Sequence, residues 1–233
     1  CEISSDGNVN GLKTTVLNAQ NANYFVVFGK QGDSYAFALV SKDAEGLDCT
    51  SYKTYDGFVS GDVKFNNCKA EAVFSTSNAL DILEETILDG LICVSSEAVG
   101  AMEKCYQLTI EYTKQRETFG KPISSHQAIQ LKLADMATKI QAARLLTYEA
   151  AKDKDNGKRV DLQSGMAKLF ASEMCAYVAM ESMRIHGGYG YIKDLPVERY
   201  YRDAPLMIIG EGTNEILSLL IANFNFFSFS FTE

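Results

Sequence analysis

A glutamate between two glycines is the first feature of this sequence that could do chemistry. Glu211 stands between Gly210 and Gly212, directly after the apolar run from Leu206 to Ile209. Glycines let a ligand approach the backbone, and a carboxylate in apolar surroundings is poorly solvated. Such a carboxylate is suited to act as a general base. The alternative interpretation is a solvated acid that complements the N-terminus of the next helix, where acidic residues are common.

An arginine follows a long helical pattern. Arg116 comes shortly before Phe119-Gly120-Lys121-Pro122, in which the glycine and the proline turn the chain sharply. One interpretation is structural, because an arginine at a helix C-terminus binds the last carbonyls and complements the helix dipole. The other is functional, because a planar guanidinium binds phosphate oxygens in a bidentate manner. The residues alone leave both open.

A third candidate is the glycine-rich stretch that contains Gly187, Gly188 and Gly190. Three glycines in four positions allow close backbone approach to a ligand, and they also allow positive φ angles. A turn that ends a helix would use the same residues. The strand that precedes a dinucleotide-binding fingerprint is missing, so we exclude a Rossmann fold here.

The first third of the chain predicts strands. Residues 23–29 and 35–41 are β-branched and aromatic runs separated by the turn-like residues 30–33, and residues 61–65 alternate again. Glycines recur every few residues, which is typical of an antiparallel barrel or sandwich.

Near residue 77 the apolar period changes to that of helices. A stripe from Leu80 to Tyr112 predicts one long helix, with Asn78 as its N-cap. Pro122 breaks the chain, and residues 124–127 predict a capping box for a second helix that ends near residues 156–157.

Two further helices follow in the pattern. Asp161 can cap a third helix that stops before Gly187, and a short fourth helix is expected from about Thr213 to Ala222. Long amphipathic helices with short connections make an antiparallel bundle. The tail from Asn223 to Glu233 alternates Phe with Asn and Ser, which is a strand-like pattern.

These elements predict an α+β fold, a partial antiparallel β barrel or sandwich followed by an antiparallel helical bundle. The predicted domains are a partial β domain at residues 1–76, a helical bundle at 77–222 and an atypical Phe-rich tail at 223–233. No internal repeat is visible.

Composition narrows the class of protein. Of 233 residues, 46% are hydrophobic, and the net charge of −8 argues against general binding to nucleic acid. No apolar run approaches 18 residues, so no membrane span is predicted. Six cysteines without a C-x-x-C pair and two histidines do not form a zinc pattern, and we expect no metal. Nothing resembles a signal peptide, so an intracellular protein is expected.

Order and spacing carry more information than the single motifs. The chain resembles the acyl-CoA dehydrogenase family in the order and spacing of five motifs. They are R-x-T-F-G-K-P-I, Gln127 with L-A-D-M, I-H-G-G-Y-G-Y, R-Y-Y-R-D-A and G-E-G-T-N-E-I. The resemblance runs from about Asn10 to Ala222 and is strongest from Glu97 to Ile216. It implies the later part of a middle β domain plus a C-terminal helical domain, and therefore a truncated chain.

The resemblance also implies a reaction, the α,β-dehydrogenation of an acyl-CoA thioester. A carboxylate removes the α proton while hydride passes to FAD, and an electron-transfer flavoprotein is the expected electron acceptor. In many members the base is the glutamate that matches Glu211. Some members place it on the first long helix of the domain, where this sequence has Asp89-Gly90-Leu91. Glu211 is therefore the predicted catalytic residue.

The family also implies residues that bind the cofactor and the substrate. Arg116 would meet the FAD pyrophosphate across a subunit interface, and Gly187 and Gly188 would approach the neighbouring flavin. The remaining predicted residues are Phe119 and Gln127 in the same site, Thr213 and Glu215 near the adenosine, and Gly212 at the substrate. A homo-oligomer, either a dimer or a homotetramer, and a cytoplasmic or mitochondrial matrix location follow from the same resemblance.

Three departures from the family pattern bear on function. Thr15-Val16-Leu17-Asn18 stands where members carry Trp-Ile-Thr-Asn, which predicts the loss of two flavin contacts. Arg184 replaces a glutamine, and Leu91 replaces a common arginine. Two alternatives therefore stay open: an acyl-CoA oxidase or flavin monooxygenase relative, and a non-catalytic helical oligomerisation module.

Overall fold

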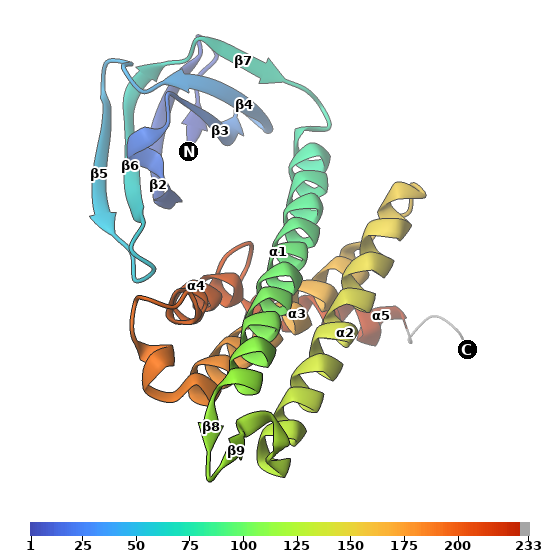
Figure 1. Cartoon of the computed structure of the whole chain (residues 1–233). Helices are drawn as coiled ribbons and strands as arrows, with labels where there is room; N and C mark the ends of the chain where they lie inside the picture. Colours follow the sequence, from blue (N-terminus) through green and yellow to red (C-terminus); the bar gives the residue numbers. More distant parts are fainter. Residues whose placement is uncertain (229–233) are drawn as a thin grey trace. The chain divides into compact units, whose positions relative to one another are not determined.

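The fold comprises two compact units, shown in a computed structural model (Figure 1). The structure describes the backbone of residues 1–228 and the side chains of residues 1–223. The sheet unit is Cys1–Glu85, and the helical unit begins at Thr86. The predicted α+β architecture is confirmed, whereas the domain boundary near residue 77 remains a prediction.

One seven-stranded sheet forms the sheet unit. Its strands lie in the order β5-β6-β2-β1-β3-β4-β7, and all neighbours are antiparallel except β1 and β3. The strands are β1 (Glu2–Ile3), β2 (Asn8–Leu17), β3 (Tyr24–Gln31), β4 (Ser34–Ser41), β5 (Leu47–Lys53), β6 (Val59–Lys69) and β7 (Ala72–Ser75). A short 3-10 turn, Ala19–Asn21, follows β2.

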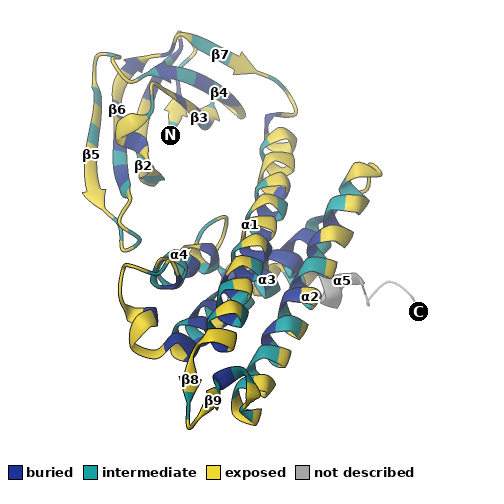
Figure 2. Ribbon diagram, viewed as in Figure 1, coloured by how far each residue is buried: buried dark blue, intermediate teal, exposed yellow. Residues whose placement is uncertain are grey.

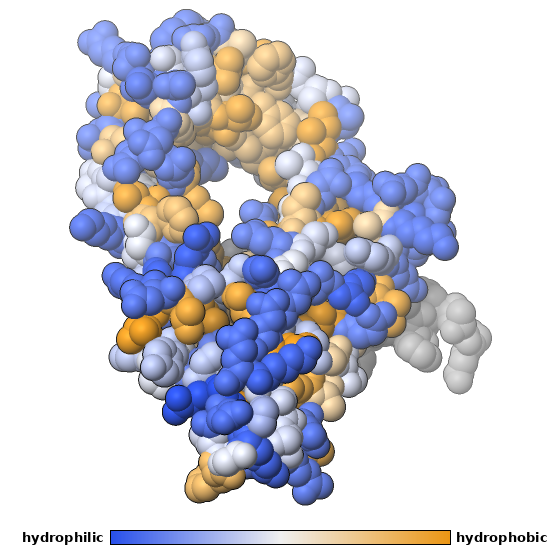
Figure 3. Space-filling model, viewed as in Figure 1, coloured by the Kyte–Doolittle hydropathy of each residue, from blue (hydrophilic) through white to orange (hydrophobic). Residues whose placement is uncertain are grey.

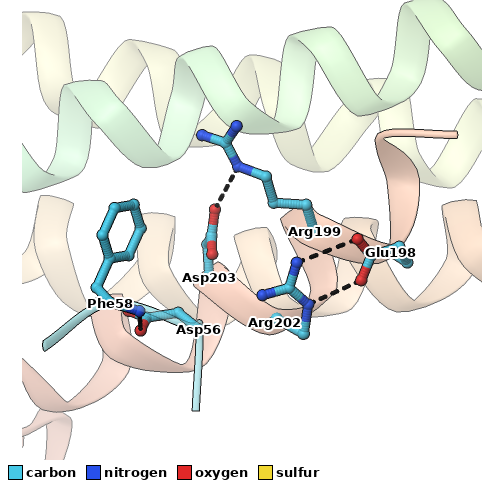
Figure 4. Close-up of polar contacts among 6 residues, drawn as sticks. All are labelled: Asp56, Phe58, Glu198, Arg199, Arg202 and Asp203. Carbon is cyan, nitrogen blue, oxygen red and sulfur yellow. Dashed lines mark hydrogen bonds and ion pairs between the residues drawn. The ribbon is translucent and has the colours of Figure 1, made fainter. Parts of the chain in front are cut away.

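The three strands expected from the sequence are present as β3, β4 and β6. They alternate buried and exposed side chains, as in β4, where Ala36, Ala38 and Val40 are fully buried. Strand β5 was not predicted because most of its residues are exposed at the sheet edge, which removes the alternating pattern. The turn after it is closed by Asp56, whose carboxylate accepts the Phe58 N–H at 3.0 Å (Figure 4).

Five helices make up most of the helical unit, and the first of them begins a few residues before that unit. They are α1 (Ala79–Gln115), α2 (Gln127–Asp155), α3 (Asp161–His186), α4 (Val197–Ile209) and α5 (Asn214–Ser228). A two-stranded hairpin, β8 (Glu117–Thr118) and β9 (Lys121–Pro122), joins α1 to α2. Short 3-10 turns lie at Ile123–Ser125 and Gly187–Tyr191.

The predicted helix caps are partly wrong. Asn78 directly precedes α1, and its carbonyl accepts the Ile82 N–H at 3.0 Å, as expected. The capping box at residues 124–127 does not form, because Ser124 and Ser125 lie in a 3-10 turn. The Ser125 hydroxyl donates instead to Pro122 O at 2.7 Å, and Gln127 is the first residue of α2.

The cap of the third helix also differs from the prediction. Val160 holds the N-cap position of α3, and Asp161 is the first helical residue. The Asp161 carboxylate is bound by the Arg159 guanidinium at 2.6 Å, and this hydrogen bond is the largest cause of the lowered pKa of Asp161. An acid in the first turn still complements the helix dipole.

Helix α4 was not predicted, since Pro205 interrupts its pattern and charged residues dominate its start. Two pairs of side chains one turn apart stabilise it: Arg202 binds Glu198 at 2.7 Å, and Arg199 binds Asp203 at 3.3 Å (Figure 4).

The strand-like interpretation of the tail is wrong for residues 223–228. These residues continue helix α5, because no glycine or proline follows Gly212 to end it. The rest of the tail, residues 229–233, lies outside the described residues.

Small and flexible apolar side chains fill the core of the helical unit. Figure 2 shows the buried stretches of its helices in dark blue. Met102 on α1, Met136 on α2 and Val178 on α3 are all fully buried in one cluster. Such interiors are close-packed, so truncation of any of them leaves a cavity.

We therefore expect Met136→Ala to lower the free energy of unfolding by about 2–5 kcal/mol. Urea titration of both variants measures this loss. Leu131→Ala on the same helix is the control, because Leu131 is 65% exposed and its loss should cost about 0.5 kcal/mol or less. Equal losses in the two variants would contradict this core.

Among the described residues, no single helix has the length and apolar composition needed to cross a membrane. One bent pair, Val197–Ile209 with Asn214–Asn223, meets those two criteria only when its helices are taken together.

Candidate active site

A cavity of about 610 Å³ lies in the helical unit between the end of α1, the β8–β9 hairpin and the end of α3. Four of the predicted cofactor residues line it: Arg116, Phe119, Gly187 and Gly188. Residues more than 65 positions apart in the sequence are thus brought together. Gln127 is exposed at the start of α2 and does not belong to the lining.

The hairpin after α1 presents the first two of these residues. The Arg116 N–H donates to Tyr112 O at 2.8 Å, and the Ile123 N–H donates to Arg116 O at 2.8 Å, which closes the hairpin. Phe119 and Gly120 both have positive φ at its turn. Phe119 is 96% exposed, and the hairpin tip carries apolar surface (Figure 3). A phenyl ring held in this way is suited to contact a ligand or a partner.

The guanidinium of Arg116 is exposed at the cavity. Among the described residues, no carboxylate lies within ion-pair distance of it, unlike Arg144, Arg184 and Arg202. The structural interpretation of Arg116 as a helix-end cation accounts for its place at the end of α1. It leaves the donors of the guanidinium available for an anion such as phosphate.

The three glycines after α3 have different roles. Gly187 ends α3 with φ of 60°, and its N–H donates to Arg184 O. A Cβ placed on Gly187 or Gly188 would meet no atom within 4 Å, so both backbones face open space at the cavity. A Cβ on Gly190 would lie 2.4 Å from Met183 O. Gly190 is therefore required by packing, whereas Gly187 and Gly188 leave room for a ligand.

A buried histidine also lines this cavity, and the sequence reasoning did not select it. The His186 ring stacks on Tyr112 with 4.3 Å between centroids, and its Nδ1 lies 2.7 Å from Ser182 O. Because a carbonyl only accepts, Nδ1 carries the proton and Nε2 of the neutral ring is an acceptor. Burial lowers the pKa of His186, against the opposing effect of the Ser182 hydrogen bond.

This lowered pKa predicts a pH dependence of stability. Above pH 6.5, the ordinary value, the ring is neutral in both states and contributes no slope. As the pH falls below 6.5, the unfolded chain binds the proton first, so stability is lost. His186→Asn should lose less stability than the parent between pH 7 and pH 5, measured by urea unfolding. Parallel curves for the two proteins over that range would rule out the buried neutral histidine.

The loop between α4 and α5 carries Glu211, which is exposed, so the poorly solvated carboxylate expected from the sequence is not observed in this chain. Glu211 and Gly212 both adopt positive φ, 53° and 87°, while Gly210 ends α4 by donating its N–H to Leu206 O at 2.7 Å. The Glu211 side chain reaches α1, because a Cβ placed on Gly90 would lie 2.9 Å from Glu211 Oε2. Gly90 thus provides the space that the carboxylate occupies, and any larger residue there would displace it.

Thr213 and Glu215 have structural partners at the start of α5. The Thr213 carbonyl accepts the Leu217 N–H at 3.0 Å, and its hydroxyl lies 3.4 Å from the Ile216 N–H. A hydrogen bond from its own backbone amide, followed by one from Thr213, lowers the pKa of Glu215. These contacts are those of a helix N-terminus.

The predicted site residues therefore form two groups on one chain. The cavity group lies at the end of α1, and the loop group lies against Gly90 of the same helix. Gly90 and Gln115 are 25 residues apart in α1, which corresponds to about 37 Å of helix. One chain does not place the two groups in a single small site.

The positions that depart from the family pattern also have defined surroundings. Thr15 has φ of 55°, and its N–H donates to the Asp62 carboxylate at 3.0 Å. Leu17 is exposed. Arg184 pairs with Glu181, and Leu91 is buried in a small cluster that includes Leu217 of α5. Leu91 therefore acts as an apolar core residue where an arginine was expected.

Comparison with known proteins identifies the class. The model of the acyl-CoA dehydrogenase C-terminal domain matches residues 80–225. An acyl-CoA dehydrogenase of Bacillus subtilis is 35% identical over 93% of this chain and 60% of its own length. A subunit of the caffeyl-CoA reductase–Etf complex of Acetobacterium woodii is 34% identical over 92% and 59%. The structure of butyryl-CoA dehydrogenase from Megasphaera elsdenii superimposes with a TM-score of 0.88 at 30% identity, covering 97% of this chain and 62% of that one.

These matches show the fold of a family of oxidoreductases and flavoproteins in fatty-acid metabolism. The chain belongs to the acyl-CoA dehydrogenase family. It spans about 60% of the length of the curated relatives that it matches.

Proposed function

We propose that this chain supplies the catalytic base and part of the cofactor site of an FAD-dependent acyl-CoA dehydrogenase. The observation that carries the proposal is the Glu211 carboxylate, held on a left-handed loop against the bare backbone of Gly90. A base must lie close to the proton it removes and be aimed at it. Glu211 takes the proton from the carbon next to the thioester carbonyl.

The cavity group fits part of an FAD molecule. The Arg116 guanidinium offers donors for the pyrophosphate, Phe119 offers an aromatic surface, and Gly187 and Gly188 leave backbone space beside the cavity. An FAD held by these residues would supply the acceptor for the hydride that leaves the β carbon of the substrate. Arg116, Phe119, Gly187 and Gly188 would hold the cofactor.

Two copies of the chain would complete the site. The cavity group and the loop group are about 37 Å apart along α1. An Arg116 that meets the cofactor beside a Glu211 must therefore come from another subunit. This supports the homo-oligomer, a dimer or a tetramer, that the sequence predicts.

The remaining assignments belong to the same proposal. Gly212 would lie at the substrate, and Gln127, Thr213 and Glu215 would lie near the cofactor, although Thr213 also caps α5 and Glu215 lies in its first turn. An electron-transfer flavoprotein is the proposed electron acceptor, and the relative from Acetobacterium woodii is named as part of an Etf complex. The cytoplasmic or mitochondrial matrix location stays a prediction.

A visible absorption spectrum tests the proposal. The purified flavin-loaded protein should be yellow, and a saturated acyl-CoA should bleach it under anaerobic conditions while an enoyl-CoA forms. Re-oxidation by air alone would favour the oxidase or monooxygenase alternative. A colourless protein that takes up no flavin would favour the non-catalytic oligomerisation module and contradict the proposal.

A further inference from the structure

A lysine is fully buried beside the Glu211 loop. Lys168 on α3 has an exposed fraction of 0%, which is rare for a lysine in a protein core. Its ammonium donates to Ile208 O at 3.1 Å, to Gly212 O at 2.8 Å and to Asn214 Oδ1 at 2.9 Å. All three donors of the ammonium are used.

The three acceptors lie on both sides of the proposed base, Glu211, along the chain. Ile208 lies in the last turn of α4, Gly212 follows Glu211 directly, and Asn214 begins α5. One side chain of α3 therefore fixes the loop on both sides of Glu211. Of the described lysines, this is the one whose ammonium binds a backbone carbonyl on each side of Glu211, at Ile208 and at Gly212.

Asn214 extends this contact into a small buried network. Its Nδ2 donates to Ser172 Oγ at 3.0 Å and to Glu173 Oε1 at 2.9 Å, both on α3. The network satisfies the polar groups that the loop brings into the interior, where an unpaired group would be costly. The start of α5 is thus fixed to the same face of α3 as the carbonyl of Gly212.

The loop needs such support because its backbone is in an unfavourable region. A non-glycine residue with positive φ, such as Glu211 at 53°, persists only where its surroundings hold it there. The hydrogen bonds from Lys168 reach the residue after Glu211 and the helix before it.

Charge adds to this geometry. Burial lowers the pKa of Lys168, and the carboxylates of Glu211, Glu173 and Glu215 oppose that effect, with Glu211 the largest of the three. The Glu211 carboxylate therefore stabilises the charged form of the Lys168 ammonium. The groups that face Lys168 from α3 and from the α4–α5 loop are these carboxylates and the three acceptors.

We infer that Lys168 is a positioning residue for the proposed base: its ammonium holds the α4–α5 loop so that Glu211 points at the substrate. The inference rests on the proposed function of Glu211. Lys168 does not touch the reacting atoms, so it acts on the rate through the loop. Substrate affinity should depend on it little.

Amide hydrogen exchange, measured on the full chain without any cofactor, tests whether Lys168 restrains the α4–α5 loop. Lys168→Met has nearly the same length but no donors. A hydrogen bond from a charged donor corresponds to about 10- to 150-fold in an equilibrium constant, so amides of residues 209–216 should exchange faster by that order. Amides of α1 and α2 should keep their parent rates. Unchanged exchange in the loop, or an equal increase throughout the helical unit, would overturn the inference.

Two further variants keep the test decisive. Lys168→Gln keeps two N–H donors and removes the charge, so it should give an intermediate increase, and it replaces Lys168→Met if that protein does not fold. Lys158→Met is the matched control, since Lys158 is an exposed lysine that pairs with Asp153. Its loop amides should exchange as in the parent.

A double-mutant cycle on the flavin-loaded enzyme separates positioning from general stability. Lys168→Met should slow flavin bleaching by acyl-CoA on the order of a hundredfold, with acyl-CoA affinity within about twofold. In the Glu211→Gln background, the same change should have no further effect on the rate. An equal loss in both backgrounds would overturn the inference. If Glu211→Gln alone bleaches at the parent rate, the proposed function fails, while the exchange result still stands for the loop.

Discussion

Replacing Glu211 by glutamine is expected to slow flavin bleaching by a saturated acyl-CoA by about 10²–10⁴-fold, the usual contribution of a positioned general base. Glutamine keeps the shape of the side chain and removes its basicity. Because the contact with Gly90 is kept, flavin content and acyl-CoA binding should stay at parent values. Stopped-flow absorption measures the rate, and equilibrium titration measures the binding.

The matched control for this change is Glu103→Gln. Glu103 lies on α1 and pairs with Arg144 away from the loop, so its bleaching rate should equal that of the parent. If Glu211→Gln bleaches at the parent rate, the base lies elsewhere. The carboxylates of α1, Glu84, Glu85 and Asp89, would be tested next. Asp89 is already bound by Lys154 at 3.0 Å, which makes it a weaker candidate.

The second large effect is expected at the cavity. Arg116→Gln should weaken FAD binding by about 10- to 150-fold, because hydrogen bonds to a charged group contribute about 1.5–3 kcal/mol. Arg116 has no carboxylate partner among the described residues, so its loss should change the stability of the apoprotein little. Fluorescence titration of FAD into the apoenzyme measures the affinity.

Arg159→Gln is the control for this second change. Arg159 is an exposed arginine whose guanidinium binds Asp161 outside the cavity. Its replacement should leave the FAD affinity at the parent value. If both arginine variants bind FAD equally well, Arg116 is a helix-end cation and the cavity is not a pyrophosphate site.

Much of the fold could be predicted because its helices and central strands have strong periodicity. The stripe from Leu80 to Tyr112 became α1, and the runs at residues 23–29 and 35–41 became β3 and β4. Strands without regular alternation were missed, both the exposed edge strand β5 and the interior strand β2. Helix α4 was hidden by Pro205, because a proline inside a helix removes a backbone hydrogen bond and is normally taken to end the helix.

The site could be predicted only where a local motif marks it. Glu211 and Arg116 both stand in short distinctive stretches of sequence. In the structure the Glu211 carboxylate lies against α1, and the Arg116 guanidinium is exposed. Lys168 was missed because a lysine in a predicted helix is normally expected to be exposed to solvent. Its partners lie 40 to 46 residues away, and only the tertiary structure brings them to it.

His186 was missed for a related reason. It directly precedes Gly187 and Gly188, which the sequence predicts as site residues. The neighbouring sequence does not show that its ring is buried against Tyr112, 74 residues earlier. The space at Gly90 has the same origin. A glycine in a helix normally indicates only low helix propensity. The structure shows why Gly90 is small, because the Glu211 carboxylate lies beside it.

The central claim is that Glu211 takes the proton from the carbon next to the thioester carbonyl. The most direct test is deuterium incorporation at that carbon, measured by mass spectrometry after incubation of an acyl-CoA with the flavin-loaded enzyme in D₂O. The parent should introduce deuterium from solvent, and Glu211→Gln should stay at the level of a sample without protein. Equal incorporation by the parent and Glu211→Gln would contradict the claim, because another group would then be removing the α proton.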